Sequence, residues 1–146
     1  MSYSAQDVAT LRKSTGAGML DCKNALVETD GDMELAKDWL RKKGISSAAK
    51  RAGRAADQGT IDVLVDGNIA AYAEVNCETD FVAKGEVFTT FVKEVTFLVA
   101  KQGVDKFEGL TFKESTVADE IITLGALVGE NVGLGRNEKL ETKKVV

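Results

Sequence analysis

The sequence predicts an α+β fold in which an N-terminal bundle of three helices precedes a small antiparallel three-stranded sheet covered by helices. Apolar residues recur at helical spacing in residues 4–43, alternate with a period of two after residue 58, and return to helical spacing after residue 86. We therefore divide the 146 residues into a three-helix domain (1–45), a basic linker (46–58) and a core subdomain (59–146) with the order hairpin, helix, helix, strand.

The N-terminal domain is expected to contain three short helices. Ser4 is placed to cap the first helix with Asp7 three positions later, and Tyr3 is placed to pack on Val8 across that cap. The second helix is expected at residues 19–28 and the third at 32–43, with Gly44 as its end. Trp39 is expected to supply much of the core of this domain. The residues that helical spacing places on the apolar faces of the three helices are Val8, Leu11, Cys22, Ala25, Leu26, Leu35, Ala36, Trp39 and Leu40.

A hairpin is expected after the linker. Residues 46–58 are small, polar and basic, which is typical of a linker with some helical tendency. The apolar side chains of Ile61, Val63 and Val65 then alternate with Asp62, Leu64 and Asp66, and a turn at residues 67–68 leads to a second strand through residues 71–75.

Two helices and a third strand complete the predicted core subdomain. Residues 87–99 carry a strong apolar stripe that has to cover a sheet or another helix. A further helix is expected at residues 116–128, capped by Ser115 and ended by residues 129–131. The third strand is expected near residues 132–140, weakened by Gly133 and Gly135 because glycine in a strand costs entropy and packs nothing.

Composition narrows the possible functions. The chain contains no histidine, and it therefore lacks the commonest general base and the commonest zinc ligand. Cys22 and Cys77 are far apart and without a metal-binding spacing, so we expect two reduced thiols. There is neither an apolar stretch of about 20 residues nor a signal peptide pattern. We expect a cytoplasmic protein with no enzymatic activity, no metal, no cofactor and no membrane contact.

The most informative segment is residues 76–83, where a strand pattern changes to a helix pattern. An aspartate at such a junction, here Asp80, normally caps the helix. The adjacent Phe81 gains roughly 1.5–3 kcal/mol from burial, either beneath its own domain or in a groove of another protein. Glu78 and Asp80 form a carboxylate pair, but two carboxylates alone seldom hold a divalent ion, which takes six or more oxygen ligands.

Two other segments are candidates for binding a partner. Residues 16–18 (Gly-Ala-Gly) lie between predicted helices without the strand and Lys-Ser pair of a phosphate loop, so an interhelical turn is favoured. Met19 and Leu20 directly after this turn are candidates for docking another protein. The net charge is −4, but residues 41–54 are basic without one acidic residue. No aromatic residue interleaves these charges to stack on bases, so a solvated face is favoured over nucleic-acid binding.

Residues 15–23 and 76–83 together resemble the two signatures of bacterial and organellar translation elongation factor Ts, and residues 129–131 resemble a third segment of that family. The resemblance spans essentially the whole chain. It implies that the three-helix unit is similar to ubiquitin-associated domains and that the rest corresponds to the first of two core subdomains. Most family members continue into a second core subdomain, and the resemblance implies nothing for this chain about the contacts that the second subdomain makes.

The resemblance also implies a nucleotide exchange factor that binds the GTPase elongation factor Tu and expels GDP. The Asp80–Phe81 pair, with Thr79 and Val82 beside it, would be inserted between helices of the GTPase domain near its magnesium and phosphate loop. Met19 and Leu20 would pack on an apolar patch of that domain, and Val128 and Gly129 on another of its helices. The oligomeric state stays open. The alternatives are a non-catalytic adaptor that binds another protein through the three-helix unit and, third, RNA binding through the basic linker.

Overall fold

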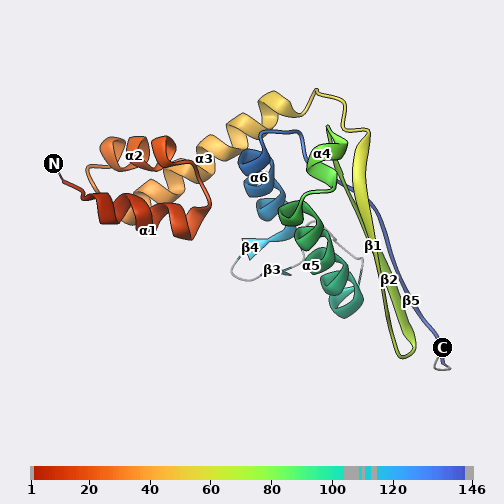
Figure 1. The fold of residues 1–146 in the computed structure, drawn as a ribbon. Coiled ribbons are helices and arrows are strands. Elements are labelled where there is room, and N and C mark those ends of the chain that lie inside the picture. The colour runs from red at the N-terminus through yellow and green to blue at the C-terminus, as the bar shows by residue number, and fades with distance from the viewer. Residues whose placement is uncertain (1, 104–108, 110, 113–114, 144–146) are drawn as a thin grey trace.

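The computed structural model describes residues 2–103, 109, 111–112 and 115–143. Its elements confirm the α+β class (Figure 1). In chain order they are α1 (Ala5–Thr15), α2 (Met19–Glu28), α3 (Met33–Arg51), β1 (Gln58–Asp66), β2 (Ile69–Cys77), α4 (Asp80–Ala83), α5 (Glu86–Gln102), β3 (Thr111–Phe112), β4 (Ser115–Thr116), α6 (Val117–Val128) and β5 (Gly133–Glu141).

Helices α1 to α3 form the N-terminal bundle. The capping box of α1 is present, because the Ser4 hydroxyl accepts the Asp7 N–H and the Asp7 carboxylate accepts the Ser4 N–H. The expected role of Trp39 is wrong: its ring is only partly buried at the edge of the cluster, with Lys43 Nζ 5.2 Å from the ring centroid, and Leu35 is exposed. Small residues let the helices approach closely, and the buried core consists of Val8, Leu11, Cys22, Ala25, Leu26, Ala36 and Leu40.

Helix α3 is longer than the sequence predicts. It continues through Gly44 to Arg51 and therefore includes the first half of the predicted linker. Packing explains the difference, because α3 lies against α6 and a Cβ at Gly44 would lie 3.3 Å from the Ile122 side chain. The glycine serves this close approach, and tertiary contact overrides its weak helix propensity. The division of the chain into domains remains a prediction.

The sheet has the strand order β1–β2–β5 and is antiparallel throughout. Gly67 in the β1–β2 turn has a φ of 60°, the conformation that glycine adopts without strain. The period of two predicted for β1 is correct, and the side chain that it turns toward the helices is Leu64. Ile61, Val63 and Val65 lie on the opposite face and are exposed.

Helix α5 covers one face of the sheet, and α6 lies between α5 and α3 (Figure 1). Ser115 is not the cap of α6: the Thr116 hydroxyl accepts the Asp119 N–H, while the Ser115 hydroxyl donates to Glu120. In the part of the chain that the structure describes, no helix has both the length and the apolar character needed to cross a membrane. The second core combines buried residues of β2, α4, α5 and α6, among them Val75, Cys77, Phe88, Val92, Val95, Val99, Val117 and Leu124.

The third strand forms in spite of its glycines. β5 pairs with β2 from Glu141 opposite Ile69 to Gly133 opposite Asn76, with an irregularity between Ala73 and Val75. Gly135 makes room at this irregularity, because a Cβ there would lie 2.7 Å from Glu74, whose carboxylate accepts the Arg136 N–H. The glycine therefore accommodates a side chain from the neighbouring strand.

Candidate functional site

The junction between β2 and α4 presents the predicted Asp80–Phe81 pair. Thr79, and not Asp80, caps α4: its backbone is extended (φ −122°, ψ 150°) and its hydroxyl accepts the Val82 N–H at 3.3 Å. Asp80 is the first residue of the helix. A threonine one position earlier satisfies the free amide, which leaves the Asp80 carboxylate available for other contacts.

Phe81 projects away from the body of the protein. Its side chain is 86% exposed, the largest exposure among the large apolar residues that the structure describes. α4 is a single turn, and the residues that face the core are Ala83, which is buried, and Val82, which is partly buried. The sequence allows this ring to lie either beneath its own domain or in a groove of another protein, and its exposure excludes the first of these.

The two carboxylates beside Phe81 have separate partners. Asp80 accepts a hydrogen bond from Lys84 Nζ at 3.1 Å, and this bond holds the pKa of Asp80 below its ordinary value. Glu78 Oε1 accepts the Asn131 N–H at 2.6 Å and lies 3.4 Å from Arg54 Nη1. Asp80 is therefore an exposed anion next to Phe81, whereas Glu78 belongs to a structural contact.

Glu130 connects α4 to the end of α6, a contact that the sequence analysis missed. Its Oε1 accepts the N–H groups of Glu78 and Thr79, both at 3.1 Å, and its Oε2 accepts the Thr79 hydroxyl at 2.7 Å. The only sequence signal was its place in the third segment that resembles the family. Sequence spacing cannot reveal a bond between residues 51 positions apart.

Val128 and Gly129 lie directly before this contact. Gly129 ends α6 in the left-handed conformation, with a φ of 71°. Val128 packs partly on the core, and Gly129 is exposed. Because Glu130 bonds to Thr79, the structure brings the predicted residues Val128 and Gly129 next to the predicted segment 79–82.

Met19 and Leu20 occupy a separate part of the molecule, at the start of α2 (Figure 1). They are 57% and 68% exposed, as expected for docking residues. Gly16 ends α1 with a φ of 71°, which confirms that residues 16–18 are an interhelical turn. The predicted partner-binding residues therefore form two groups, one on the three-helix bundle and one where α4 meets the end of α6.

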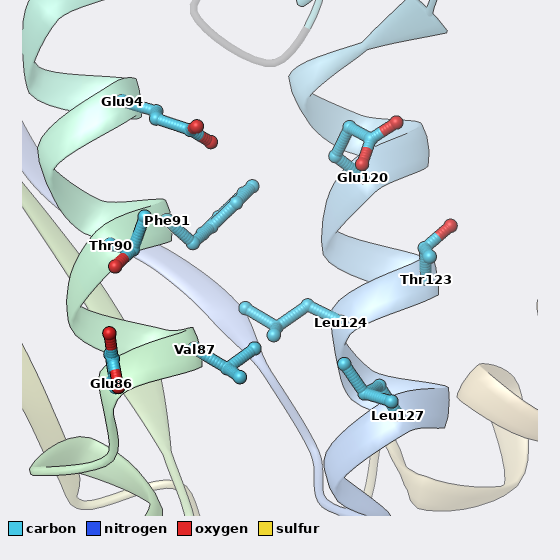
Figure 2. A pocket seen from close by; sticks show the side chains of 9 residues that line it. All are labelled: Glu86, Val87, Thr90, Phe91, Glu94, Glu120, Thr123, Leu124 and Leu127. Carbon is cyan, nitrogen blue, oxygen red and sulfur yellow. The ribbon is translucent and has the colours of Figure 1, made fainter. Parts of the chain in front are cut away.

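An open groove separates α5 from α6 (Figure 2). It has a volume of about 430 Å³ and begins at the N-terminal end of α5, which Lys84 and Gly85 join to α4. Its floor is apolar, and the described residues that line it include three glutamates and no cation. The apolar residues are Val87, Phe91, Leu124 and Leu127, and the glutamates are Glu86, Glu94 and Glu120.

The basic stretch at residues 41–54 lies mostly on α3, where several cations contact acidic groups of the same chain. These ion pairs support the interpretation of a solvated face, since the charges are already partly neutralised. The pairs are Arg41–Asp38 at 2.9 Å, Lys42–Asp38 at 2.7 Å, Lys43–Asp21 at 2.6 Å and Arg54–Glu78 at 3.4 Å.

Comparison with known proteins gives one consistent likeness. A family model described as Elongation factor TS matches residues 78–146. Elongation factor Ts of Rhodospirillum centenum is 49% identical over 141 residues, which cover 94% of this chain and 46% of that protein. Elongation factor Ts of Methylobacterium nodulans is 49% identical over 149 residues (99% and 48%), and that of Magnetococcus marinus 45% over 146 residues (97% and 48%). The chain spans about half the length of the curated relatives it matches.

Proposed function

The chain belongs to the elongation factor Ts family, and from this premise we propose that it binds the GTPase elongation factor Tu and promotes release of GDP during translation elongation. The observation that carries the proposal is the position of Phe81, 86% exposed on a one-turn helix with an ionised aspartate beside it. We call residues 79–82 the wedge.

The wedge is suited to entering a groove of the partner. Burial of the exposed Phe81 ring would contribute roughly 1.5–3 kcal/mol, most of it available only in the complex. Asp80 would then bring a negative charge toward the surroundings of the partner's magnesium ion, where charge and hydrogen bonding alter the water ligands. Both effects weaken the partner's hold on GDP without any covalent step.

Such a factor requires no enzymatic chemistry of its own. It has to bind the nucleotide-free partner more tightly than the GDP-bound partner, and the difference in affinity drives release. By linkage, GDP weakens binding of the chain by the same factor as the chain weakens binding of GDP. This role would place the chain with the translation machinery in the cytoplasm.

Met19 and Leu20 supply a second contact in this proposal. Their exposure on α2 supports packing on an apolar patch of the same GTPase domain. Val128 and Gly129 would contact the partner beside the wedge. Two contact regions on one protein raise the overall affinity, because binding at one region brings the other close to its site.

The proposal is tested by release of fluorescently labelled GDP from purified elongation factor Tu. Release should accelerate with increasing amounts of the chain and reach a plateau, and an excess of unlabelled GDP should shift the half-saturating concentration upward. Release that stays at its spontaneous rate with the chain in saturating amounts would refute the proposed function.

The exposure of Met19 and Leu20 also fits an adaptor that binds another protein through the N-terminal bundle alone. This second candidate predicts that the double variant Met19→Ala/Leu20→Ala loses binding while nucleotide release never depends on the chain. The exchange proposal predicts that the same variant raises the half-saturating concentration and keeps a measurable plateau.

A further inference from the structure

We infer that Glu130 is the positioning residue of the wedge: its carboxylate fixes the direction in which α4 presents Asp80 and Phe81. The inference rests on the proposed function, because it names the residue that prepares the exchange site for its partner. Glu130 itself is only partly exposed and makes its bonds within the chain.

Helix α4 cannot hold its own orientation. It has four residues, and a helix of one turn has almost no stability in isolation because nucleation is unfavourable. Apart from Ala83 and the partly buried Val82, it has little apolar anchorage. Its direction is therefore set by the residues at its ends.

Glu130 controls the N-terminal end of α4. The Thr79 hydroxyl donates its proton to Glu130 Oε2 at 2.7 Å, which leaves an oxygen lone pair to accept the Val82 N–H at 3.3 Å. The bonds from the N–H groups of Glu78 and Thr79 to Oε1, both 3.1 Å, fix the backbone on the other side of the same residue. Bonds to a charged acceptor are about twice as strong as neutral ones.

The contact between residues 78–79 and residues 130–131 is reciprocal. Glu78 Oε1 accepts the Asn131 N–H at 2.6 Å, so each segment supplies one carboxylate to the backbone of the other. The Asn131 side chain donates to the Arg54 carbonyl at 2.8 Å and adds the chain segment after α3 to the same junction. Two contacts in opposite directions prevent rotation of the wedge about a single bond.

The test begins with the chain alone, so that it does not depend on any partner. Glu130→Ala should speed amide hydrogen exchange at Thr79 and Val82 by about tenfold or more, because local opening becomes easier. Amides in the middle of β2, such as that of Ala73, should keep their rates. Glu130→Gln retains an acceptor for the backbone N–H groups and should give an intermediate effect, and Thr79→Ser should leave exchange unchanged.

The second measurement is GDP release from elongation factor Tu at a temperature where all variants are folded. Glu130→Ala should raise the half-saturating concentration of the chain about tenfold. This factor corresponds to the free-energy cost of ordering one backbone residue on binding. Glu130→Gln should restore part of this loss. The matched control is Glu138→Ala, which removes an exposed glutamate of β5 and should behave as the wild type in both measurements.

The outcomes separate the two claims. Unchanged hydrogen exchange at Thr79 and Val82 in Glu130→Ala overturns the positioning role. The positioning role is also overturned if Glu130→Ala shows faster hydrogen exchange but still promotes GDP release with an unchanged half-saturating concentration, because the carboxylate is then only structural. If even the wild type fails to promote release, the proposed function fails, and the hydrogen-exchange result still decides whether Glu130 orders the wedge.

Discussion

Phe81 illustrates how a residue of a type usually found in cores is kept at the surface. Ala83 fills the buried position of α4, and the single turn of helix then points the ring of Phe81 outward. The motif in the sequence identified this residue, but only the structure shows that its ring is exposed and not buried in its own domain. The hydrogen bond from Lys84 lowers the pKa of the neighbouring Asp80 and so favours its charged form further.

The two cysteines are buried, in contrast to the exposed Phe81 ring of the wedge. Cys22 and Cys77 are buried, and desolvation is the main cause that raises the pKa of each thiol. The thiolate is the reactive species, so both residues should react slowly at neutral pH. We predict that an aromatic disulfide reagent labels the unfolded protein at least tenfold faster than the native protein. Equal rates at pH 7.5 would show that the thiols are accessible.

At the level of elements, the end of α6 determines where Glu130 lies. Gly129 has a φ of 71°, a conformation that costs other residues roughly 1–2 kcal/mol. Gly129→Ala should therefore lower the free energy of unfolding by about 1 kcal/mol, measured by urea denaturation. Gly133→Ala is the control, because Gly133 has no positive φ and a Cβ there meets nothing within 4 Å. Equal stability of the two variants would argue against strain at Gly129.

The capping box of α1 makes a prediction about pH. The hydrogen bond from the Ser4 N–H is the main cause that lowers the pKa of Asp7 below 3.8 in the folded state. The charged carboxylate therefore stabilises the folded state above pH 3.8, and this contribution is lost as the pH falls through the lower folded value. Asp7→Asn should remove that part of the acid-dependent loss of stability. If the melting temperatures of wild type and variant change with pH in parallel, Asp7 does not contribute to the acid-dependent loss of stability.

Element types were largely predictable, whereas their limits and faces were not. Helical and alternating periods identified the helices of the bundle, the hairpin and α5, because these periods depend on local sequence. Gly44, expected to end α3, lies inside it because its contact with Ile122 comes from a distant helix. The face of β1 was equally beyond prediction, since alternation has two phases and only Leu64 meets the core. Resemblance to the family identified the residues of the wedge and the segment that contains Glu130, but the contact between Glu130 and Thr79 is visible only in three dimensions.

On the scale of the whole molecule, the two predicted contact groups are held on one framework. Helix α3 is continuous over 19 residues, starting in the bundle that carries Met19 and Leu20 and reaching α6. Its packing on α6, together with the junction of Arg54, Glu78 and Asn131, connects the bundle to the wedge. A partner that engages both groups therefore meets surfaces whose spacing is already set, which reduces the entropy cost of binding.

The exposed Phe81 ring is proposed to drive release of GDP, and stopped-flow release of labelled GDP from elongation factor Tu tests this role most directly. At saturating protein, Phe81→Ala should slow the release about ten- to hundredfold relative to the wild type, the equivalent of losing one buried aromatic ring. The control Phe97→Ala removes a half-exposed ring on α5 and should promote GDP release as the wild type does. A Phe81→Ala protein that matches the wild type at saturation would contradict the claim.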